Sequence, residues 1–553
     1  MNMPNKATPD AVTGGFNLMK FMCVFLISVI GFSGFLVRDP LSNELWTVVQ
    51  VRNLYFKLKK AMLEESDGIE VGKDKLLPTG FDDKSCLSRY QSLLYHRGST
   101  RRTPSPHLIS KLRSYEARHK RCSPYTDSYN KTVNYLLQQS EGEVYSSTFN
   151  CKYVVWISMN GLGNQMLSMA STFLYALLTD RVLLLDRGVD IPDLFCEPFP
   201  EASWFLPSDF PFTSDDFNSF NQRSDKSYGN LLRSNVNTTT SAPRPYMHLY
   251  LAYDYDDADK RFFCDEDQTY LHNIPWLLMK SDGYYVPSLF SMPSFQQDLQ
   301  TFFPEKDAIF HLLSRYLFHP TNSVWGLVTR YYDAYLSKAD VITGIQVRVF
   351  DGEPGNPFKH VMDQILNCTK RENILPQIKE NHYQSTSNLK NITVAVLMTS
   401  LSSGYYEQMR EMYLQNPTTA GEAVGVFQPS HEEFQQTEKH SHNQKALAEI
   451  YLLSLTDKLV TSGWSTFGYV AQGIGGLKPW ILYRPENRVA PEPPCERAKS
   501  MEPCYHGPPA NDCKLRIGGV EKGALVPHVS HCEDVSWGLK LVQQNQPHSI
   551  VNQ

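Results

Sequence analysis

Residues 154–186, VVWISMNGLGNQMLSMASTFLYALLTDRVLLLD, have the pattern of a strand, a glycine loop, a helix and a second strand. The apolar run Val154–Ile157 stops before the loop Gly161-Leu162-Gly163-Asn164, apolar residues then recur at helical spacing to Leu177, and Val182–Leu185 is again apolar. This predicts a parallel βαβ unit, whose loop and helix N-terminus lie at the sheet edge where anionic or sugar ligands bind. A plain tight turn is the alternative, because the third glycine of a dinucleotide fingerprint is missing.

One uncharged apolar segment, Phe21–Val37, precedes this unit. Its length is near the lower limit for spanning a bilayer, and it lacks the small residues that end a signal peptide. We therefore expect a retained membrane anchor over residues 21–37, with a cleaved signal peptide as the alternative. Lys6 and Lys20 mark residues 1–20 as a cytoplasmic tail. The rest of the chain is expected to be lumenal.

The body has features of the secretory pathway. Besides Cys23 in the anchor there are ten cysteines, none with Cys-x-x-Cys spacing, which favours disulfides over zinc and leaves their connectivity open. A net charge of -5 disfavours nucleic acid as a partner. The cysteines are Cys86, Cys122, Cys151, Cys196, Cys264, Cys368, Cys495, Cys504, Cys513 and Cys532, and the N-glycosylation sequons are at Asn130, Asn237, Asn367 and Asn391.

The length of the body predicts more than one domain. Residues 38–77 are mixed and charged, which favours a stem. The remainder is too long for one core and suits two domains of ordinary size. We place an N-terminal, Rossmann-like domain at 78–323 and a C-terminal domain with a tail at 324–553.

The second half alternates strands and helices again. A helix over Val324–Leu336 leads into the strand Val341–Phe350, which contains Arg348. An arginine near the end of a buried parallel strand needs a partner. That partner is either a phosphate held by the guanidinium fork or a carboxylate, with Asp351 and Asp363 as candidates. The local sequence leaves both alternatives open.

A turn farther along the chain suits a phosphate. Ser465 and Thr466 follow the strand Lys458–Thr461 and offer hydroxyls and backbone N–H groups where a helix begins, although capping alone would explain one hydroxyl. Arg348 is expected two strands away on the same sheet edge, which favours a diphosphate site. Two such domains with loop-lined sheet edges predict the α/β, GT-B-like architecture of nucleotide-sugar glycosyltransferases.

Three stretches closely resemble the plant α-1,2-fucosyltransferase family, which includes the xyloglucan (galactoside) 2-α-L-fucosyltransferases. The stretches are Gly161–Asn164 with Phe173–Leu184, Gly344–Phe350 and Ser465–Gly473, and the resemblance covers about residues 78–515. It implies a Golgi enzyme, anchored as a type II membrane protein, that moves L-fucose from GDP-β-L-fucose to O2 of a galactose with inversion. No cofactor or metal is implied.

The resemblance implies a plant cell-wall glycan as acceptor, with xyloglucan side chains first and arabinogalactan or pectic chains as alternatives. A membrane-anchored glycan-binding protein that has lost catalysis is a further alternative. The sequence leaves open whether the protein forms a homodimer or a complex with other Golgi glycosyltransferases.

The resemblance also assigns roles to residues. Arg348 matches the arginine that binds the donor diphosphate, and Ser465, Thr466 and Phe467 match the donor-binding turn. Gly161, Gly163 and Asn164 match the loop that faces the transfer site. Two departures are Gln165, where the plant motif has a basic residue, and Val349, where related enzymes often have a second arginine.

The expected chemistry needs positive charge at the diphosphate, because negative charge develops on GDP as it leaves, and Arg348 is the candidate. Asp282, before a glycine turn, is the candidate base for the acceptor hydroxyl; it could instead cap that turn, or the route could need no direct base. The acidic stretch Asp254–Asp259 contains two Asp-x-Asp patterns that could hold a divalent metal. We favour a solvated acidic loop there, because Arg348 already supplies positive charge.

Overall fold

The computed structural model describes residues 75–82, 84–97, 102–137, 149–188, 190–234, 244–350, 357–379, 392–436, 439–509, 513 and 527–543. All of them belong to one compact unit that spans Gly72–Gln553. The expected tail and anchor (1–37), almost all of the expected stem, and the sequons at Asn237 and Asn391 lie outside the described residues. No helix within the described ranges is long and apolar enough to cross a membrane.

The first sheet contains the βαβ unit expected at residues 154–186. Strands β1 (Tyr153–Ile157) and β2 (Val182–Leu185) are parallel and are joined by α6 (Leu162–Leu178). The sheet order is β2-β1-β4-β3, with β3 at Tyr246–Leu251 and β4 at Trp276–Ser281, and every pairing is parallel. All residues of β1, β2 and β4 are buried, as expected for a parallel sheet covered on both faces. The predicted unit is confirmed.

The second sheet has the order β10-β9-β8-β5-β6-β7, and all its pairings are parallel except that of the edge strand β10. Its strands are β5 (Val341–Val347), β6 (Thr393–Ser400), β7 (Ala423–Phe427), β8 (Lys458–Ser462), β9 (Trp480–Leu482) and β10 (Cys495–Arg497). The prediction that Arg348 and the Ser465 turn lie two strands apart was wrong. Strands β5 and β8 pair directly, which brings Arg348 and the turn to neighbouring strand ends.

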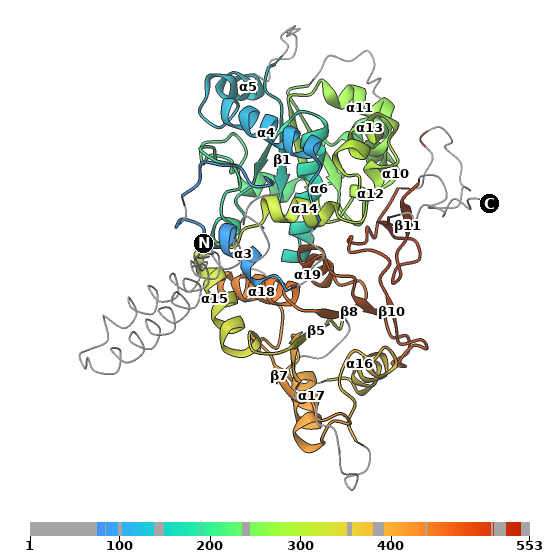
Figure 1. Ribbon diagram of the computed structural model, residues 1–553. Coiled ribbons are helices and arrows are strands. Elements are labelled where there is room, and N and C mark those ends of the chain that lie inside the picture. The colour runs from blue at the N-terminus through green and yellow to red at the C-terminus, as the bar shows by residue number, and fades with distance from the viewer. Residues whose placement is uncertain are drawn as a thin grey trace, which may run out of the picture. The chain divides into compact units, whose positions relative to one another are not determined.

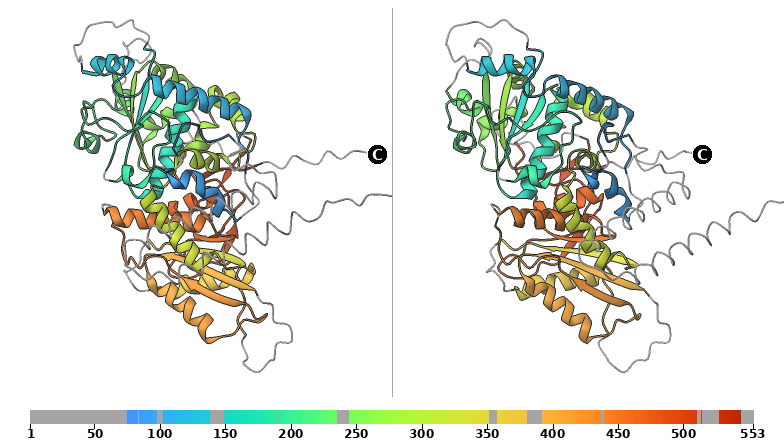
Figure 2. Two further views of the ribbon diagram at one scale, coloured as in Figure 1. Left: turned by 60° about the vertical axis from the view of Figure 1, so that its left-hand side comes forward. Right: turned by 90° about the vertical axis from the view of Figure 1, so that its left-hand side faces the viewer.

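Two packed helices, one from each sheet's half of the unit, form a contact between the layers of the first and the second sheet. Figures 1 and 2 show the first sheet and its helices above the second sheet, and α6 packs against α19 (Thr466–Gly475), the helix that follows β8. The helix expected at Val324–Leu336 is α15 (Asn322–Tyr331) continued by a π-turn at Tyr332–Leu336. The domain boundary at 323/324 stays a prediction.

Two of the sequons lie on the remaining helices. Asn130 on α5 and Asn367 on α16 have exposed side chains, as an N-glycan requires. The helices are α3 (Leu87–Tyr95), α4 (Pro106–Arg121), α5 (Asp127–Leu137), α7 (Ile191–Leu194), α8 (Ser214–Ser219), α9 (Tyr228–Arg233), α10 (Asp257–Lys260), α11 (Asp265–His272), α12 (Val286–Leu289), α13 (Pro293–Phe302), α14 (Ile309–Leu317), α16 (Lys359–Arg371), α17 (Ser403–Gln415) and α18 (His440–Ser454).

The last part of the chain returns to the first half. This C-terminal segment, residues 498–509 with 527–543, includes the short strands β11 (Val529–His531) and β12 (Leu539–Leu541). The hydroxyls of Tyr505 and Tyr255 lie 2.9 Å apart, and the Tyr284 hydroxyl donates to Glu502 at 2.5 Å.

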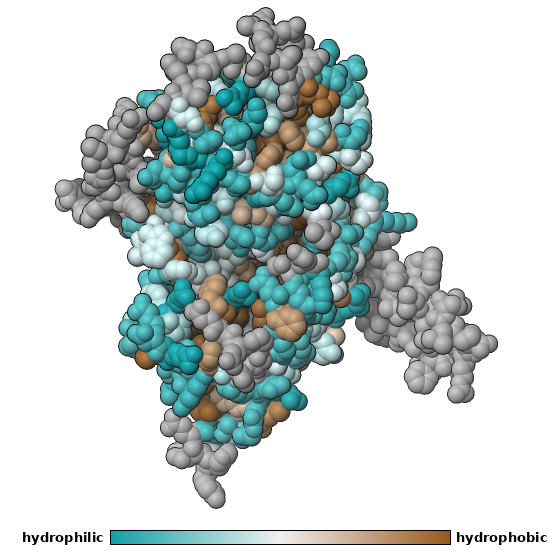
Figure 3. Space-filling view, turned by 180° about the vertical axis from the view of Figure 1, so that it is seen from behind, coloured by the Kyte–Doolittle hydropathy of each residue, from teal (hydrophilic) through white to brown (hydrophobic). Residues whose placement is uncertain are grey.

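Polar residues dominate the surface seen from behind, with apolar residues in scattered patches (Figure 3).

All ten body cysteines are paired, which confirms the expected disulfides. Three of the five bridges join residues more than 100 positions apart in sequence, so they constrain the fold as a whole. The pairs are Cys86–Cys196, Cys122–Cys151, Cys264–Cys513, Cys368–Cys495 and Cys504–Cys532.

Candidate active site

One pocket gathers all seven of the residues expected at the donor. It lies between the loop that begins α6, the end of β5, the turn that begins α19, and α18. The expected residues in its wall are Gly161, Gly163, Asn164, Arg348, Ser465, Thr466 and Phe467. Residues separated by three hundred positions in sequence therefore share one cavity.

Arg348 directly follows β5 and points a half-buried guanidinium into this pocket. Its backbone N–H donates to Ser462 Oγ at 2.9 Å, and its Nη2 donates to Gln435 Oε1 at 2.9 Å. Burial lowers the pKa of Arg348, and no carboxylate among the described residues forms an ion pair with it. Asp363 is thus not its partner, and Asp351 lies outside the described residues. An arginine held this way is suited to bind an anion.

The turn before α19 offers both the hydroxyls and the backbone N–H groups that were expected. Ser465 is the N-cap, and its Oγ accepts from the Gly468 N–H at 3.4 Å, so the capping alternative holds for this hydroxyl. The Thr466 Oγ1 donates to Asn164 Oδ1 at 2.8 Å. The N-terminus of a ten-residue helix therefore faces the same pocket as Arg348, and its N–H groups and dipole favour a negative ligand.

The glycine loop touches this turn closely. A Cβ on Gly163 would lie 2.8 Å from the Thr466 carbonyl carbon and 2.9 Å from the Phe467 nitrogen. Asn164 bridges the two halves, because it accepts from Thr466 and its Nδ2 donates to the Asp282 carbonyl oxygen at 3.1 Å. The loop thus connects the pocket of Arg348 to Asp282.

Asp282 lines a second, smaller pocket that shares Asn164 and Thr466 with the first. The side chain is 5% exposed, and burial raises the pKa of Asp282 to about 6, although the hydrogen bond from Asn160 Nδ2, 2.7 Å from Oδ2, opposes this rise. The Gly283 N–H instead donates to Ser281 Oγ at 3.4 Å. The Asp282 carboxylate also accepts from the backbone N–H groups of Tyr253 and of Asp282 itself. Asp282 therefore has the burial and position of a proton acceptor, and it also supports the local backbone together with Ser281.

The acidic stretch Asp254–Asp259 has structural partners. Asp256 caps α10 by accepting from the N–H groups of Ala258 and Asp259, and it forms an ion pair with Arg233. None of its four aspartates lines the larger pocket. Among the described residues, the one group with the geometry of a metal site is Cys504, Cys532 and Asp534, and its cysteines form a disulfide. Metal independence stays a prediction.

Several residues in or beside the two pockets were missed by the sequence analysis. Asn160, which holds the Asp282 carboxylate, adopts a positive φ of 61° just before the glycine loop, and its place there was a usable signal. Glu449 on α18 is buried, which raises its pKa to about 7, and it accepts from the Ser430 hydroxyl. Residues such as Glu449 and Gln435 gave no signal, because in sequence they are ordinary helix or loop residues.

An arginine and a helix N-terminus at one sheet edge, joined through an asparagine to a buried carboxylate, define a transferase site for a sugar nucleotide. The profile of the family described as xyloglucan fucosyltransferase matches residues 61–514. This chain therefore belongs to the xyloglucan fucosyltransferase family, and the resemblance noted in the sequence is confirmed.

Individual relatives agree with this assignment. Galactoside 2-alpha-L-fucosyltransferases of Pisum sativum and Arabidopsis thaliana are 56% and 58% identical to this chain, over 97% and 84% of its length and 94% and 82% of theirs. Among solved structures, the chain is similar to Arabidopsis thaliana FUT1, an arginine-to-lysine variant in complex with GDP. The TM-score is 0.79 at 56% identity, covering 85% of this chain and 100% of that one.

Proposed function

We propose that this protein transfers L-fucose from GDP-β-L-fucose to O2 of a galactose, with inversion at the fucose anomeric carbon, and that its acceptor is a xyloglucan side chain. The observation that carries the proposal is the shared pocket wall. Arg348 and the α19 N-terminus lie in the larger pocket, and Asn164 and Thr466 connect it to the pocket that contains Asp282. A donor and an acceptor can thus meet at Asn164.

The donor diphosphate lies against Arg348 and the Ser465–Phe467 turn in this proposal. As the bond from the fucose anomeric carbon to the phosphate oxygen breaks, negative charge grows on GDP and the sugar becomes oxocarbenium-like. The fixed charge of Arg348 and the N–H groups of α19 stabilise that charge without rearranging. The two sheets act as the halves of a GT-B-like enzyme, with the donor held by the second sheet.

The acceptor galactose enters the smaller pocket, beside Asp282. Its O2 attacks the anomeric carbon from the face opposite GDP, which inverts the configuration, and Asp282 takes the hydroxyl proton. Asn160 orients the carboxylate at 2.7 Å. A pKa of about 6 leaves Asp282 mostly ionised at neutral pH and basic enough to accept a proton.

The proposal needs no metal or other cofactor, because Arg348 and the helix N-terminus supply the positive potential. It also includes a Golgi location with Phe21–Val37 as a type II anchor, so that the body and its disulfides face the oxidising lumen. Arabinogalactan and pectic chains remain alternative acceptors.

The test measures GDP release and fucosylated product from GDP-fucose with galactosylated xyloglucan, arabinogalactan, pectic chains or no acceptor. We expect rapid release with xyloglucan alone, an α-linked product by NMR, and unchanged rates in EDTA. Transfer to another glycan would reassign the acceptor. GDP binding without transfer to any acceptor would indicate a glycan-binding protein, and loss of activity in EDTA would restore the metal hypothesis for Asp254–Asp259.

A further inference from the structure

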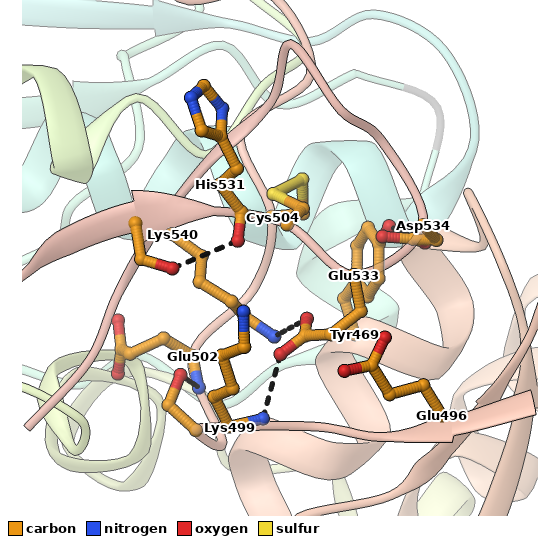
Figure 4. Close-up of polar contacts among 12 residues, drawn as sticks. Tyr469, Glu496, Lys499, Glu502, Cys504, His531, Glu533, Asp534 and Lys540 are labelled. Atoms are coloured by element: carbon orange, nitrogen blue, oxygen red, sulfur yellow. Dashed lines mark hydrogen bonds and ion pairs between the residues drawn. A yellow bond between two sulfur atoms is a disulfide. The ribbon is translucent and has the colours of Figure 1, made fainter. Parts of the chain in front are cut away.

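One residue of the C-terminal segment, Asp534, accepts hydrogen bonds from the Gly463–Phe467 turn and from α19. The Trp464 backbone N–H donates to Asp534 Oδ2 at 2.7 Å, and the Trp464 indole Nε1–H donates to the Asp534 carbonyl oxygen at 2.7 Å. The Tyr469 hydroxyl, one turn into α19, donates to the same Oδ2. Figure 4 shows Asp534 beside Tyr469. Asp534 thus contacts the turn and the helix that follows it.

The turn needs such a support. Trp464 has a φ of 62°, a left-handed conformation that is costly for a bulky residue and persists only where the surroundings enforce it. The adjacent Gly463 is confined, since a Cβ there would lie 2.8 Å from the Leu482 carbonyl oxygen and 3.1 Å from Asp534 Cβ. Ser465 and Thr466 follow at once, so the conformation of Trp464 sets the direction from which α19 meets the pocket.

The segment that carries Asp534 is held together by a disulfide and by buried polar contacts of its own. The Cys504–Cys532 disulfide closes it, and the neighbouring Glu533 forms a fully buried ion pair with Lys540 at 2.8 Å. Glu533 also accepts from the Lys499 N–H at 2.7 Å (Figure 4). These contacts of Glu533 all lie within the C-terminal segment, whereas those of Asp534 reach the donor turn.

The same carboxylate is linked to the acceptor side. The Tyr469 hydroxyl lies 3.0 Å from His506 Nε2, and His506 lines the pocket of Asp282. Asp534 is therefore hydrogen-bonded to Trp464, which directly precedes Ser465 of the larger pocket, and through Tyr469 it is connected to His506 of the smaller pocket.

We propose that Asp534 is a positioning residue that holds the Gly463–Phe467 turn in the conformation that binds the donor diphosphate. It lines neither pocket and acts through Trp464 and Tyr469. The inference rests on the assignment of this turn to the donor made under Proposed function. It adds that donor affinity depends on a segment more than 60 residues downstream.

The test compares Asp534→Ala and Asp534→Asn with the matched control Glu533→Gln, in the complete lumenal body. The measurements are the Kd of GDP by calorimetry, KM and kcat with GDP-fucose, and Tm. We expect Asp534→Ala to weaken GDP binding by about tenfold or more, the range for losing a hydrogen bond to a charged group. Asp534→Asn should recover part of this affinity, because its amide oxygen can still accept from Trp464. Glu533→Gln should lower Tm and leave the GDP Kd unchanged.

A GDP Kd that stays at the parental value in Asp534→Ala, or that rises equally in Glu533→Gln, would overturn the inference. If Asp534→Ala fails to fold, Asp534→Asn and Tyr469→Phe carry the test, since each removes part of the contact; parental GDP affinity in both would equally overturn it. Arg348→Lys distinguishes a failure of the donor assignment from a failure of the Asp534 inference. If that variant binds GDP like the parent, the donor assignment itself has failed, whereas weakened binding there with normal binding in the Asp534 variants rejects only the inference.

Discussion

At the residue scale, Arg348 shows how position decides the role of a charged side chain. A guanidinium partly withdrawn from water is costly unless a counter-charge meets it, and its partners here are a neutral amide, a serine that binds the backbone, and the Phe350 ring 5.5 Å away. None of these cancels the charge. The site is therefore prepared for an anionic ligand that arrives from outside.

Replacing Arg348 by lysine should lower kcat/KM far more than it lowers Tm. An ammonium group is a point charge and cannot make the two parallel hydrogen bonds of a guanidinium to a diphosphate. We expect a loss of at least about 2 kcal/mol of transition-state stabilisation, the scale of one charge-stabilising donor. Steady-state kinetics and thermal melts of both proteins would measure it. Near-parental turnover would return Arg348 to a structural role.

Asp282→Asn separates a proton acceptor from a structural carboxylate. Folding and GDP affinity should survive, and transfer should fall by roughly a hundredfold or more, the contribution of a positioned base. Since the base must be ionised, parental activity should also fall as the pH drops through about 6, and the variant should lose this acidic limb. Hydrolysis of GDP-fucose should fall less than transfer. Parental transfer rates in the variant would remove Asp282 from the mechanism.

At the element scale, the site depends on how the start of α6 meets the start of α19. Each helix follows a parallel strand, and each N-terminus lies at the carboxyl edge of its own sheet. The Asn164–Thr466 hydrogen bond joins the two ends at 2.8 Å. A glycine at 163 permits this approach, because the backbone of the α19 turn occupies the space of a side chain.

Gly163→Ala should therefore displace the donor turn. Its Cβ would meet the Thr466 and Phe467 backbone at under 3 Å, and backbone atoms cannot move aside as a side chain can. Gly161→Ala is the matched control, since its Cβ would meet the flexible Gln435 side chain at 3.1 Å. We expect Gly163→Ala to weaken GDP binding and transfer by at least about tenfold, which is the scale of the free-energy penalty for one overpacked contact. Gly161→Ala should lose less GDP affinity and less transfer activity. Equal effects would show that the close approach is unimportant.

At the scale of the whole molecule, the C-terminal segment connects parts that lie far apart in sequence. Glu502 is buried, accepts from the Tyr284 hydroxyl, two residues after Asp282, and accepts from the Phe310 N–H at the start of α14. The Gln472 side chain on α19 donates to its carbonyl oxygen at 3.1 Å. One residue thus links the Asp282 turn to the helix of the donor turn.

The buried Glu502 carboxyl should make the free energy of unfolding depend on pH. Burial raises the pKa of Glu502 to about 8 from an ordinary value near 4.5, so the folded protein binds this proton more tightly than the unfolded chain. Its contribution is fully present below about pH 4.5 and is lost as the pH rises through about 8. Glu502→Gln should flatten the decline in Tm between pH 5 and about 8.5 relative to the parent. Parallel Tm profiles for the two proteins would contradict the assignment.

The sequence by itself was enough to predict the βαβ unit at 154–186, the presence of disulfides, and the common sheet edge of Arg348, Ser465 and Thr466. These depend on local periodicity, residue chemistry and motif resemblance, which are visible along the chain. The choice of partners depended on the fold. Only the tertiary structure decided that β5 and β8 are neighbours, that Ser281 supports the turn beside Asp282, and that Asp534 holds Trp464, because contacts between distant segments are set by packing, and packing leaves no local pattern in sequence.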